Sequence, residues 1–226
     1  MIQRRPRDSN YLSLPAPHPA DLETRYTSNF YERPTLRVCR DLLGAYLIHE
    51  TANGICGGRI VEVEAYLGPE DLGAHSSGGR RTPRNEVMYG PRGHAYIFLI
   101  YGMYWCFNVV TGINHRPQAV LVRALEPVLG IDLMKNRLSS QPHVPLASLC
   151  RGPGKLCKAL GITREYNGED LAGNRLYLVP GRRLPSSRVG RSPRINIDYA
   201  GEWIDKPWRL YERGNPCVSG PAKLRI

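Results

Sequence analysis

The sequence lacks the motifs of several common catalytic and metal-binding classes. None of its six cysteines forms a C-x-x-C pair, and there is no H-E-x-x-H segment. Zinc fingers, zinc ribbons and zinc-protease helices are therefore not expected. The Gly-Pro-Gly-Lys segment at 152–155 lacks the spacing of a phosphate-binding P-loop. No Ser-His-Asp or Cys-His pattern is apparent, and the six scattered histidines argue against a metal site.

Long apolar runs are also missing. No run is long enough to span a membrane, and the N-terminal MIQRRPRDSN is not followed by the apolar core of a secretory signal. We therefore expect a protein that is neither secreted nor held in a membrane. Several of the cysteines lie within apolar runs, as core thiols of a reducing compartment do. The six are Cys39, Cys56, Cys106, Cys150, Cys157 and Cys217.

Acidic residues are scarce relative to basic ones. The 226 residues, enough for one domain with a sizeable core, include 31 Lys and Arg but only 20 Asp and Glu, for a net charge of +11. Such an excess favours a partner rich in phosphate, above all a nucleic acid, although a basic surface with no such partner is the simpler alternative. Arginines predominate around residues 80–92, and their planar forks suit phosphate groups.

The segment 59–66, RIVEVEAY, alternates in the manner of a β-strand. Three side chains are expected on each face: Val61, Val63 and Ala65 on one, and Glu62, Glu64 and Tyr66 on the other. The Cα atoms of the two acids would lie roughly 6.5–7 Å apart. An unpaired buried carboxylate is costly, so two acids beside an aromatic ring indicate a functional site.

Two interpretations of these acids remain open at this point. Glu62 and Glu64 are compatible with a two-carboxylate glycoside hydrolase. Alternatively, one acid is a general base and the other is structural, since a carboxylate beside a ring and away from water can have a raised pKa. Arg123 is the one charge in the apolar strand predicted at 119–125. It must pair with an acid or line a cavity, and a structural ion pair is as plausible as an active-site role.

A polar loop and a hairpin follow the strand. The loop at 67–89 is rich in Gly and Arg and holds His75, and Gly102-Met103 then separates two aromatic strands. Tyr101 at the hairpin tip is a candidate wedge into a stack of nucleic-acid bases, unless such rings cap the core. Tyr66, His75 and Phe98 could form an aromatic slot for a planar base taken out of a duplex.

The order of predicted elements indicates an α+β protein. Strands outnumber helices, and few strand–helix–strand units follow one another. We expect a single domain at 25–226, built on a curved, largely antiparallel β-sheet with flanking helices and a protruding β-hairpin. Residues 1–24, rich in Pro, Arg, Ser and Asp, are expected to form a flexible basic N-terminal arm.

Three further elements are expected along the chain. A helix should begin at Pro34 and end before Gly44. A second helix should follow Glu126-Pro127 and run through Leu138. Residues 182–194 should be a basic connection, and residues 195–197 should form a strand.

Six stretches closely resemble the alkyladenine (3-methyladenine) DNA glycosylase family. They run in order over about residues 25–219: EVEAYLGPEDLGAHS, GGRRTPRN, YGMYWCFNV, VLVRALEP, RGPGKLCKALGI and AGEWIDKPWRLYERGNP. Several long motifs in one order are far more specific than a single short motif.

The resemblance implies a monofunctional DNA glycosylase of base excision repair. Such a hydrolase flips alkylated or deaminated purines (the 3-methyladenine, 7-methylguanine, hypoxanthine and ethenoadenine class) out of double-stranded DNA and cleaves the N-glycosidic bond, leaving an abasic site. It implies no metal or organic cofactor. It also implies work in the cytoplasm, at the nucleoid, if the source is bacterial, or in the nucleus if it is eukaryotic. A monomer is the default for an enzyme that slides along DNA.

The resemblance also assigns catalytic roles. Glu64, in preference to Glu62, becomes the general base that activates a water. Arg123 and the backbone carbonyl of Ile195 would help to hold that water.

Base-binding roles follow in the same way. Tyr66, His75 and Phe98 would sandwich and contact the flipped base. Asn108 would exclude guanine by clashing with its exocyclic amine. Tyr101 would fill the gap left in the duplex.

Two departures from the family and one question of register bear on the pocket. Phe98 stands where some relatives carry Tyr, and Asn196 stands where some carry Gly, so the range of lesions is open. A strict two-residue turn would pair Phe98 with Phe107 and put Asn108 on the opposite face. We predict instead a three-residue loop or a bulge at the hairpin tip, which brings Asn108 onto the Phe98 face.

Two other functions compete with the glycosylase. One is a nucleic-acid-binding module without catalysis, against which an intact Glu64, Arg123 and Tyr66 argue. The other is a glycosidase acting on carbohydrate, against which the net charge of +11 argues.

Overall fold

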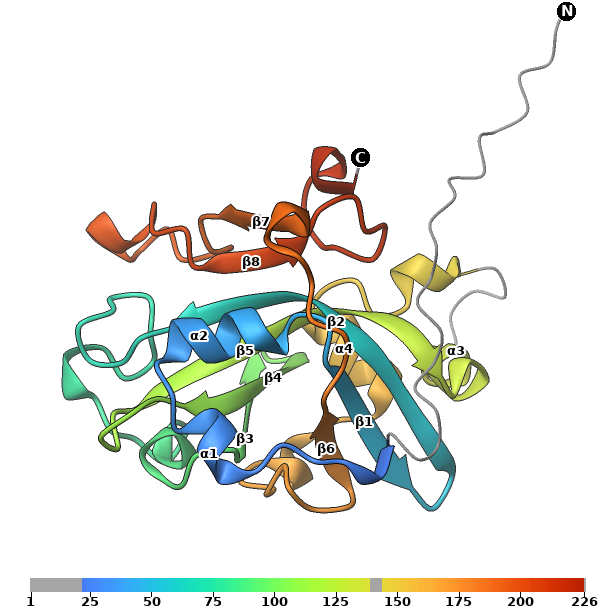
Figure 1. Ribbon diagram of the computed structural model, residues 1–226. Coiled ribbons are helices and arrows are strands. Elements are labelled where there is room, and N and C mark those ends of the chain that lie inside the picture. Colours follow the sequence, from blue (N-terminus) through green and yellow to red (C-terminus); the bar gives the residue numbers. More distant parts are fainter. Residues whose placement is uncertain (1–21, 139–143, 226) are drawn as a thin grey trace, which may run out of the picture.

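An eight-stranded sheet organises the chain (Figure 1). The computed structural model describes residues 22–138 and 144–225. Within them the sheet is strongly curved, largely antiparallel and accompanied by a few helices, so the predicted α+β class is confirmed. Residues 1–21 of the predicted flexible arm lie outside the described residues.

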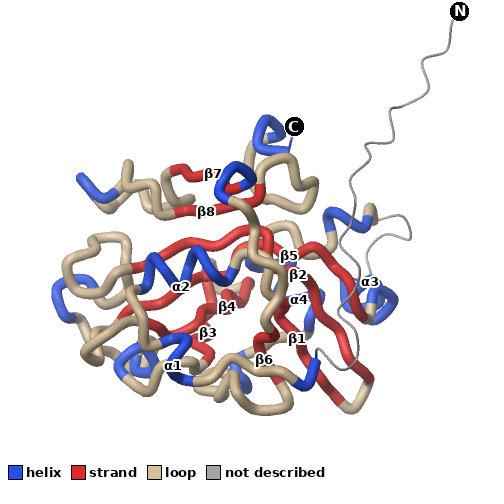
Figure 2. The backbone as a smooth tube through the Cα atoms, in the orientation of Figure 1, coloured by secondary structure: helices blue, strands red, loops and turns tan. Residues whose placement is uncertain are grey.

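Two α-helices precede the first strand, and two more lie between β5 and β6 (Figure 2). The strands are β1 (Tyr46–Thr51), β2 (Gly54–Tyr66), β3 (Ala95–Ile100), β4 (Tyr104–Thr111), β5 (Gln118–Leu129), β6 (Leu176–Val179), β7 (Val189–Ser192) and β8 (Arg209–Glu212). The α-helices are α1 (Ser28–Tyr31), α2 (Thr35–Leu42), α3 (Ile131–Leu138) and α4 (Pro153–Leu160). The sheet order is β3-β4-β5-β2-β1-β6, and β8 joins β2 to β7.

Strand β2 is the centre of the sheet because its 13 residues have room for three neighbours. One edge pairs with β5. The other edge pairs first with β1, over Gly54–Arg59, and then with β8, over Glu62–Glu64. The second half of β2 therefore carries its acids into the region where β5 and β8 flank it.

The main hydrophobic core combines the apolar sides of the sheet and the helices. Helix α2 packs on β2 and β5, while α4 packs on β4, β5 and α3. Helix α2 begins at Thr35, one residue after the predicted start at Pro34, and it ends before Gly44 as predicted; Gly44 has a positive φ of 93°. All six cysteines are buried free thiols, which confirms the expectation of core thiols.

The predicted alternation of β2 is correct from Glu62 onward and wrong for Val61. Val63 and Ala65 lie in the main core, whereas Val61 packs with Ala124 in a second cluster. The reason is that the β2–β5 register shifts on both sides of Glu62. A local irregularity of this kind reverses the face on which the following side chains lie.

The hairpin has the register that the sequence analysis favoured. Strands β3 and β4 are joined by a three-residue loop, Tyr101–Met103, in which Tyr101 has φ 52° and Gly102 has φ 68°. Tyr96 consequently pairs with Asn108. Directly opposed residues share a face, so Asn108 lies on the same face as Phe98, and that prediction is confirmed.

One predicted helix starts later than expected, and one predicted strand is wrong. Strand β5 continues through Glu126 to Leu129, because Glu126 pairs with Arg59 of β2 and forms a buried ion pair with it. The helix α3 therefore begins only at Ile131, and it ends at Leu138 as predicted. Residues 195–197 are not a strand: Asn196 has φ 60°, and the backbone N–H of Ile195 is bonded to a side chain. The strand of this region, β7, lies instead inside the predicted connection at 182–194.

Candidate active site

A cavity of about 710 Å³ opens beside the hairpin and the second half of β2. It is bordered by β3, β4 and β5, by the start of α4 and by the segment 195–199. Seven of the eight site residues predicted from the sequence line it: Tyr66, His75, Phe98, Tyr101, Asn108, Arg123 and Ile195. The eighth, Glu64, lies just behind this wall, fully buried, and each of its side-chain partners lines the cavity.

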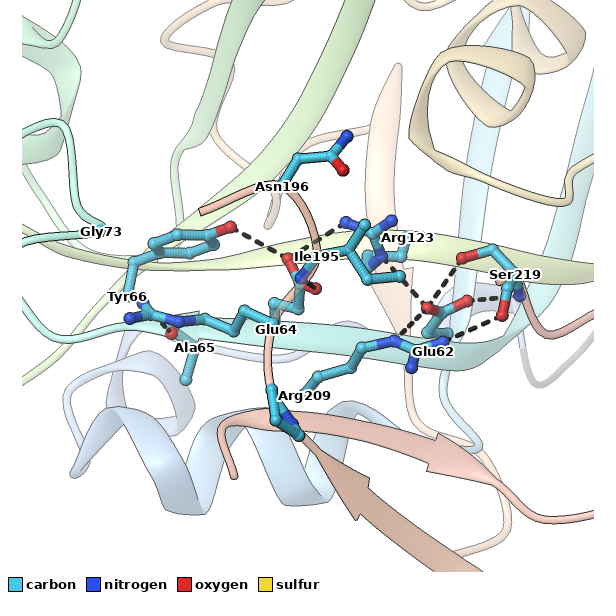
Figure 3. A network of polar contacts seen from close by, with 12 residues as sticks. Glu62, Glu64, Ala65, Tyr66, Gly73, Arg123, Ile195, Asn196, Arg209 and Ser219 are labelled. Carbon is cyan, nitrogen blue, oxygen red and sulfur yellow. Dashed lines mark hydrogen bonds and ion pairs between the residues drawn. The ribbon is translucent and has the colours of Figure 1, made fainter. Parts of the chain in front are cut away.

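Glu64 accepts three hydrogen bonds (Figure 3). The Tyr66 hydroxyl donates to Oε2 at 2.9 Å, and Nη1 of Arg123 donates to the same oxygen at 3.1 Å. The backbone N–H of Ile195 donates to Oε1 at 2.8 Å. A carboxylate offers about four lone-pair sites, so these contacts among the described residues leave one site for a further donor.

Glu62 is engaged more completely (Figure 3). Its Oε1 accepts from Nε of Arg123 at 3.1 Å, from Nε of Arg209 at 2.7 Å and from the Ser219 hydroxyl at 2.8 Å. Its Oε2 accepts from the Ser219 backbone N–H at 2.7 Å. Three of these four donors converge on Oε1, and two of the four are arginines. Burial alone would raise the pKa of Glu62, but the two arginines and the Ser219 N–H outweigh it and lower the pKa.

The two acids of β2 therefore differ in their surroundings. Glu62 is held by two buried arginines and Ser219, as a structural acid is, and neither Arg209 nor Ser219 lines the cavity. Glu64 keeps acceptor capacity next to the cavity. Arg123 is ion-paired to both acids and also lines the cavity.

His75 and Phe98 form an aromatic corner of the cavity. Their ring centres are 4.5 Å apart with the planes at 72°, and Nδ1 of His75 is 2.7 Å from the hydroxyl of Tyr96. Burial first, and then the charges of Arg84 and Arg80, lower the pKa of His75 to about 4. The imidazole is therefore neutral near pH 7 and retains one donor and one acceptor nitrogen.

Asn108 lies deep in the same cavity, 3% exposed. Its Nδ2 donates to the backbone carbonyl of Tyr96 at 3.0 Å across the hairpin. This bond fixes the orientation of the amide, so the side chain forms a rigid part of the wall.

Tyr101 stands at the hairpin tip with 67% of its surface exposed. Met103 and Tyr104 beside it are also exposed. The hydroxyl of Tyr101 is 3.4 Å from Nδ2 of Asn196, a residue whose φ is 60°. The tip thus presents apolar area to the exterior at the edge of the cavity.

Cations surround this opening. Arg151, Lys155 and Lys158 line the cavity on the α4 side. On the other side, the guanidinium of Arg84 lies 5.1 Å from the centre of the Phe98 ring. Part of the excess of basic residues in the sequence therefore lies around the cavity.

Sequence reasoning missed several residues that build the site. Tyr96 is one, although its place two residues before Phe98 on a strand could have shown that they share a face. Arg194 and Asp71 are two more: they form a fully buried bidentate ion pair. No local pattern links positions 71 and 194, so the sequence carried no signal for that contact.

Among the described residues, no group of three or more His, Cys, Asp or Glu side chains is arranged to hold a metal ion. No helix of the described residues is both long enough and apolar enough to cross a membrane.

Comparisons with known proteins point to one family. A family model described as methylpurine-DNA glycosylase matches residues 29–216. A protein of Bacillus cereus (strain AH820) with the provisional name 3-methyladenine DNA glycosylase is 53% identical over 199 residues, covering 84% of this chain and 97% of the relative. A protein of the same name from Clostridium acetobutylicum is 48% identical over 196 residues, covering 84% of this chain and 95% of the relative.

Proposed function

The chain belongs to the methylpurine-DNA glycosylase family, and from this premise we propose that it is a monofunctional glycosylase for damaged purines in double-stranded DNA. Membership makes it a hydrolase that acts on N-glycosyl bonds. The proposed substrates are alkylated or deaminated purines of the 3-methyladenine, 7-methylguanine, hypoxanthine and ethenoadenine class. The proposed product is an abasic site in DNA.

The observation that carries this proposal is the difference between the two acids of β2. Glu62 accepts four hydrogen bonds, and Glu64 accepts three beside the cavity. A general base needs a free lone pair within reach of the proton that it takes. Glu64 meets that need, so we assign it as the base that activates the attacking water.

The proposed reaction needs one base and one water. As Glu64 takes a proton, the water oxygen bonds to the anomeric carbon, and the electron pair of the broken glycosidic bond leaves with the purine. Arg123 and the backbone carbonyl of Ile195 are proposed to hold the water. Alkylation puts positive charge on the purine and makes it a good leaving group, so neutral lesions such as hypoxanthine should react more slowly.

The base is proposed to enter the aromatic corner. An extrahelical base needs flat apolar faces and a few fixed polar groups. Tyr66, His75 and Phe98 can supply the faces, and the neutral ring of His75 supports contact with an uncharged base edge. Asn108, held by Tyr96, is assigned the exclusion of guanine.

Tyr101 is proposed to fill the gap that the flipped nucleotide leaves. An exposed ring on a short hairpin is the kind of apolar wedge that enters a base stack. The cations at the cavity edge, Arg84 and Lys155 among them, are suited to the phosphates on either side.

We expect a monomer that needs no metal or organic cofactor and works on chromosomal DNA, at the nucleoid if the source is bacterial like the named relatives.

Single-turnover base release tests the proposal. The substrates are duplexes with one 3-methyladenine or one hypoxanthine, and the proteins are the native chain and Glu64→Gln. Release by the native protein, falling by roughly 10²–10⁴-fold in the variant while lesion binding is retained, is the expected result. Tight lesion binding without release by the native protein would leave a damage-binding module. Equal release by both proteins would mean that Glu64 is not the base.

A further inference from the structure

Two segments far apart in the chain complete the cavity, and one buried ion pair joins them. The loop at 67–75 carries His75, and the segment 194–199 carries Ile195. Between them, Nη1 of Arg194 lies 2.6 Å from Oδ2 of Asp71, and Nη2 lies 2.7 Å from Oδ1. Both side chains are 0% exposed. A bidentate Arg–carboxylate pair of this kind is strong and also directional.

The loop is built around this pair. Asp71 also accepts from the backbone N–H groups of Leu67 at 3.0 Å and Gly73 at 2.9 Å, which closes the loop on itself. A Cβ atom at Gly73 would lie 2.9 Å from Nη2 of Arg194. Any larger residue there would push against the guanidinium, so the loop that leads to His75 is fitted closely to Arg194.

Arg194 also supports Tyr66. Its guanidinium carbon lies 4.7 Å from the centre of the Tyr66 ring and 5.1 Å from the ring of Trp208, and Nη1 donates to the carbonyl of Ala65 at 3.1 Å. A guanidinium that stacks on an aromatic ring restricts the movement of that ring. The Tyr66 hydroxyl at the far end of that ring is one of the three donors to Glu64 (Figure 3).

Arg194 also positions a second donor to Glu64, the backbone N–H of the residue that follows it. Ile195, whose N–H donates to Glu64, directly follows Arg194. We propose that Arg194, held by Asp71, is a positioning residue that fixes two of the three donors around Glu64 and joins the base-contacting loop to them. Arg194 is not part of the cavity wall, so its effect passes through Tyr66 and Ile195. The inference rests on the proposed function.

The test uses Arg194→Lys and Asp71→Asn in the full chain. Lysine keeps the charge but loses the planar fork and the stacked surface. Single-turnover release of hypoxanthine should fall by about 10–100-fold in each variant, because small displacements of catalytic groups are costly in rate. Binding to a duplex with a non-hydrolysable 2′-fluoro analogue of the lesion nucleotide should weaken by less than the release rate falls, since neither residue itself lines the cavity.

A matched control separates positioning from general stability. Arg59 forms another buried ion pair, with Glu126 and Glu212, and does not line the cavity. Arg59→Lys should lower the melting temperature to a similar degree while it leaves the release rate within about threefold. A second control places Arg194→Lys in a Tyr66→Phe background. In that background Arg194→Lys should reduce the release rate by a smaller factor than in the native chain, because the Tyr66 hydroxyl that Arg194 positions is absent.

The outcomes are distinct. Positioning is supported if Arg194→Lys and Asp71→Asn lose rate, Arg59→Lys does not, and the loss shrinks without the Tyr66 hydroxyl. It is overturned if the two variants release base at the native rate, or if Arg59→Lys loses as much rate for the same loss of melting temperature. If the native protein itself releases no base, the proposed function fails, and the positioning role fails with it.

Discussion

Glu62 and Glu64 share one guanidinium: Arg123 donates from Nε to Glu62 and from Nη1 to Glu64, each at 3.1 Å. The two acids stand two positions apart on β2 and are both fully buried. They differ in what else they contact. Glu62 also holds Arg209 and Ser219, whereas Glu64 turns toward groups of the cavity wall.

This difference predicts that the two acids respond in opposite ways to the same substitution. Glu62→Gln should lower the free energy of unfolding by about 3–5 kcal/mol, because it leaves buried Arg209 without its carboxylate and sets an amide N–H₂ against other donors. Glu64→Gln should cost less stability and far more activity. Urea denaturation of both variants, alongside base release, measures the contrast. A larger loss of stability for Glu64→Gln would contradict the assignment of Glu62 as the structural acid.

Acid should destabilise the protein partly through His75. Its pKa is lowered from 6.5 to about 4 by burial first and then by Arg84 and Arg80. Between these two pH values the unfolded chain binds a proton that the folded protein does not, so this contribution is complete above pH 6.5 and is lost as the pH falls toward 4. The slope is at most about 1.4 kcal/mol per pH unit for one proton.

His75→Gln should reduce this slope, because an amide does not titrate in that range. Melting temperatures of both proteins from pH 4.5 to 7.5 test it. Buried His49 also has a lowered pKa, so a remaining slope of the same sign is expected in the variant. Identical slopes for the native protein and the variant would mean that His75 is not held neutral by the fold.

Tyr101 should matter for duplex DNA and little for the fold. Its ring is 67% exposed, and stacking of an aromatic ring with bases contributes about 1–3 kcal/mol. Tyr101→Ala should therefore reduce base release from duplex DNA by about 10–100-fold with little change in melting temperature. Tyr101→Phe, which keeps the ring and loses only the 3.4 Å contact to Asn196, is the matched control and should stay near the native rate. Equal losses in both variants would argue against a wedge.

Asn108 should set the selectivity against guanine. The bond from its Nδ2 to the Tyr96 carbonyl prevents the amide from turning away. Asn108→Ala should raise the release of 7-methylguanine relative to hypoxanthine by roughly tenfold or more, because the clash with the exocyclic amine disappears. Competition between the two lesions in one reaction gives the ratio directly. An unchanged ratio would remove Asn108 from the selectivity of the pocket.

The sequence by itself determined the parts of the site that depend on local geometry. The alternation along 62–66 places both acids and Tyr66 on one strand, and the role that the family gives to Asn108 led to the prediction of the three-residue loop that brings Asn108 onto the Phe98 face. The resemblance to a known family supplied the role expected of each residue. These features are encoded locally because strand faces alternate and short turns fix register.

Only the tertiary structure decided how the acids differ and what holds them. The bond from Ile195 to Glu64 joins residues 131 positions apart, and the pair of Arg194 with Asp71 joins residues 123 apart. The same contacts explain why the predicted strand at 195–197 does not form: the N–H of Ile195 is taken by a buried carboxylate. Val61 lies on the face opposite to the predicted one for a similar reason, since the register shift beside Glu62 depends on the pairing of β2 with β5. A local pattern records which face a side chain occupies, but the partner that it meets there comes from folding the whole chain.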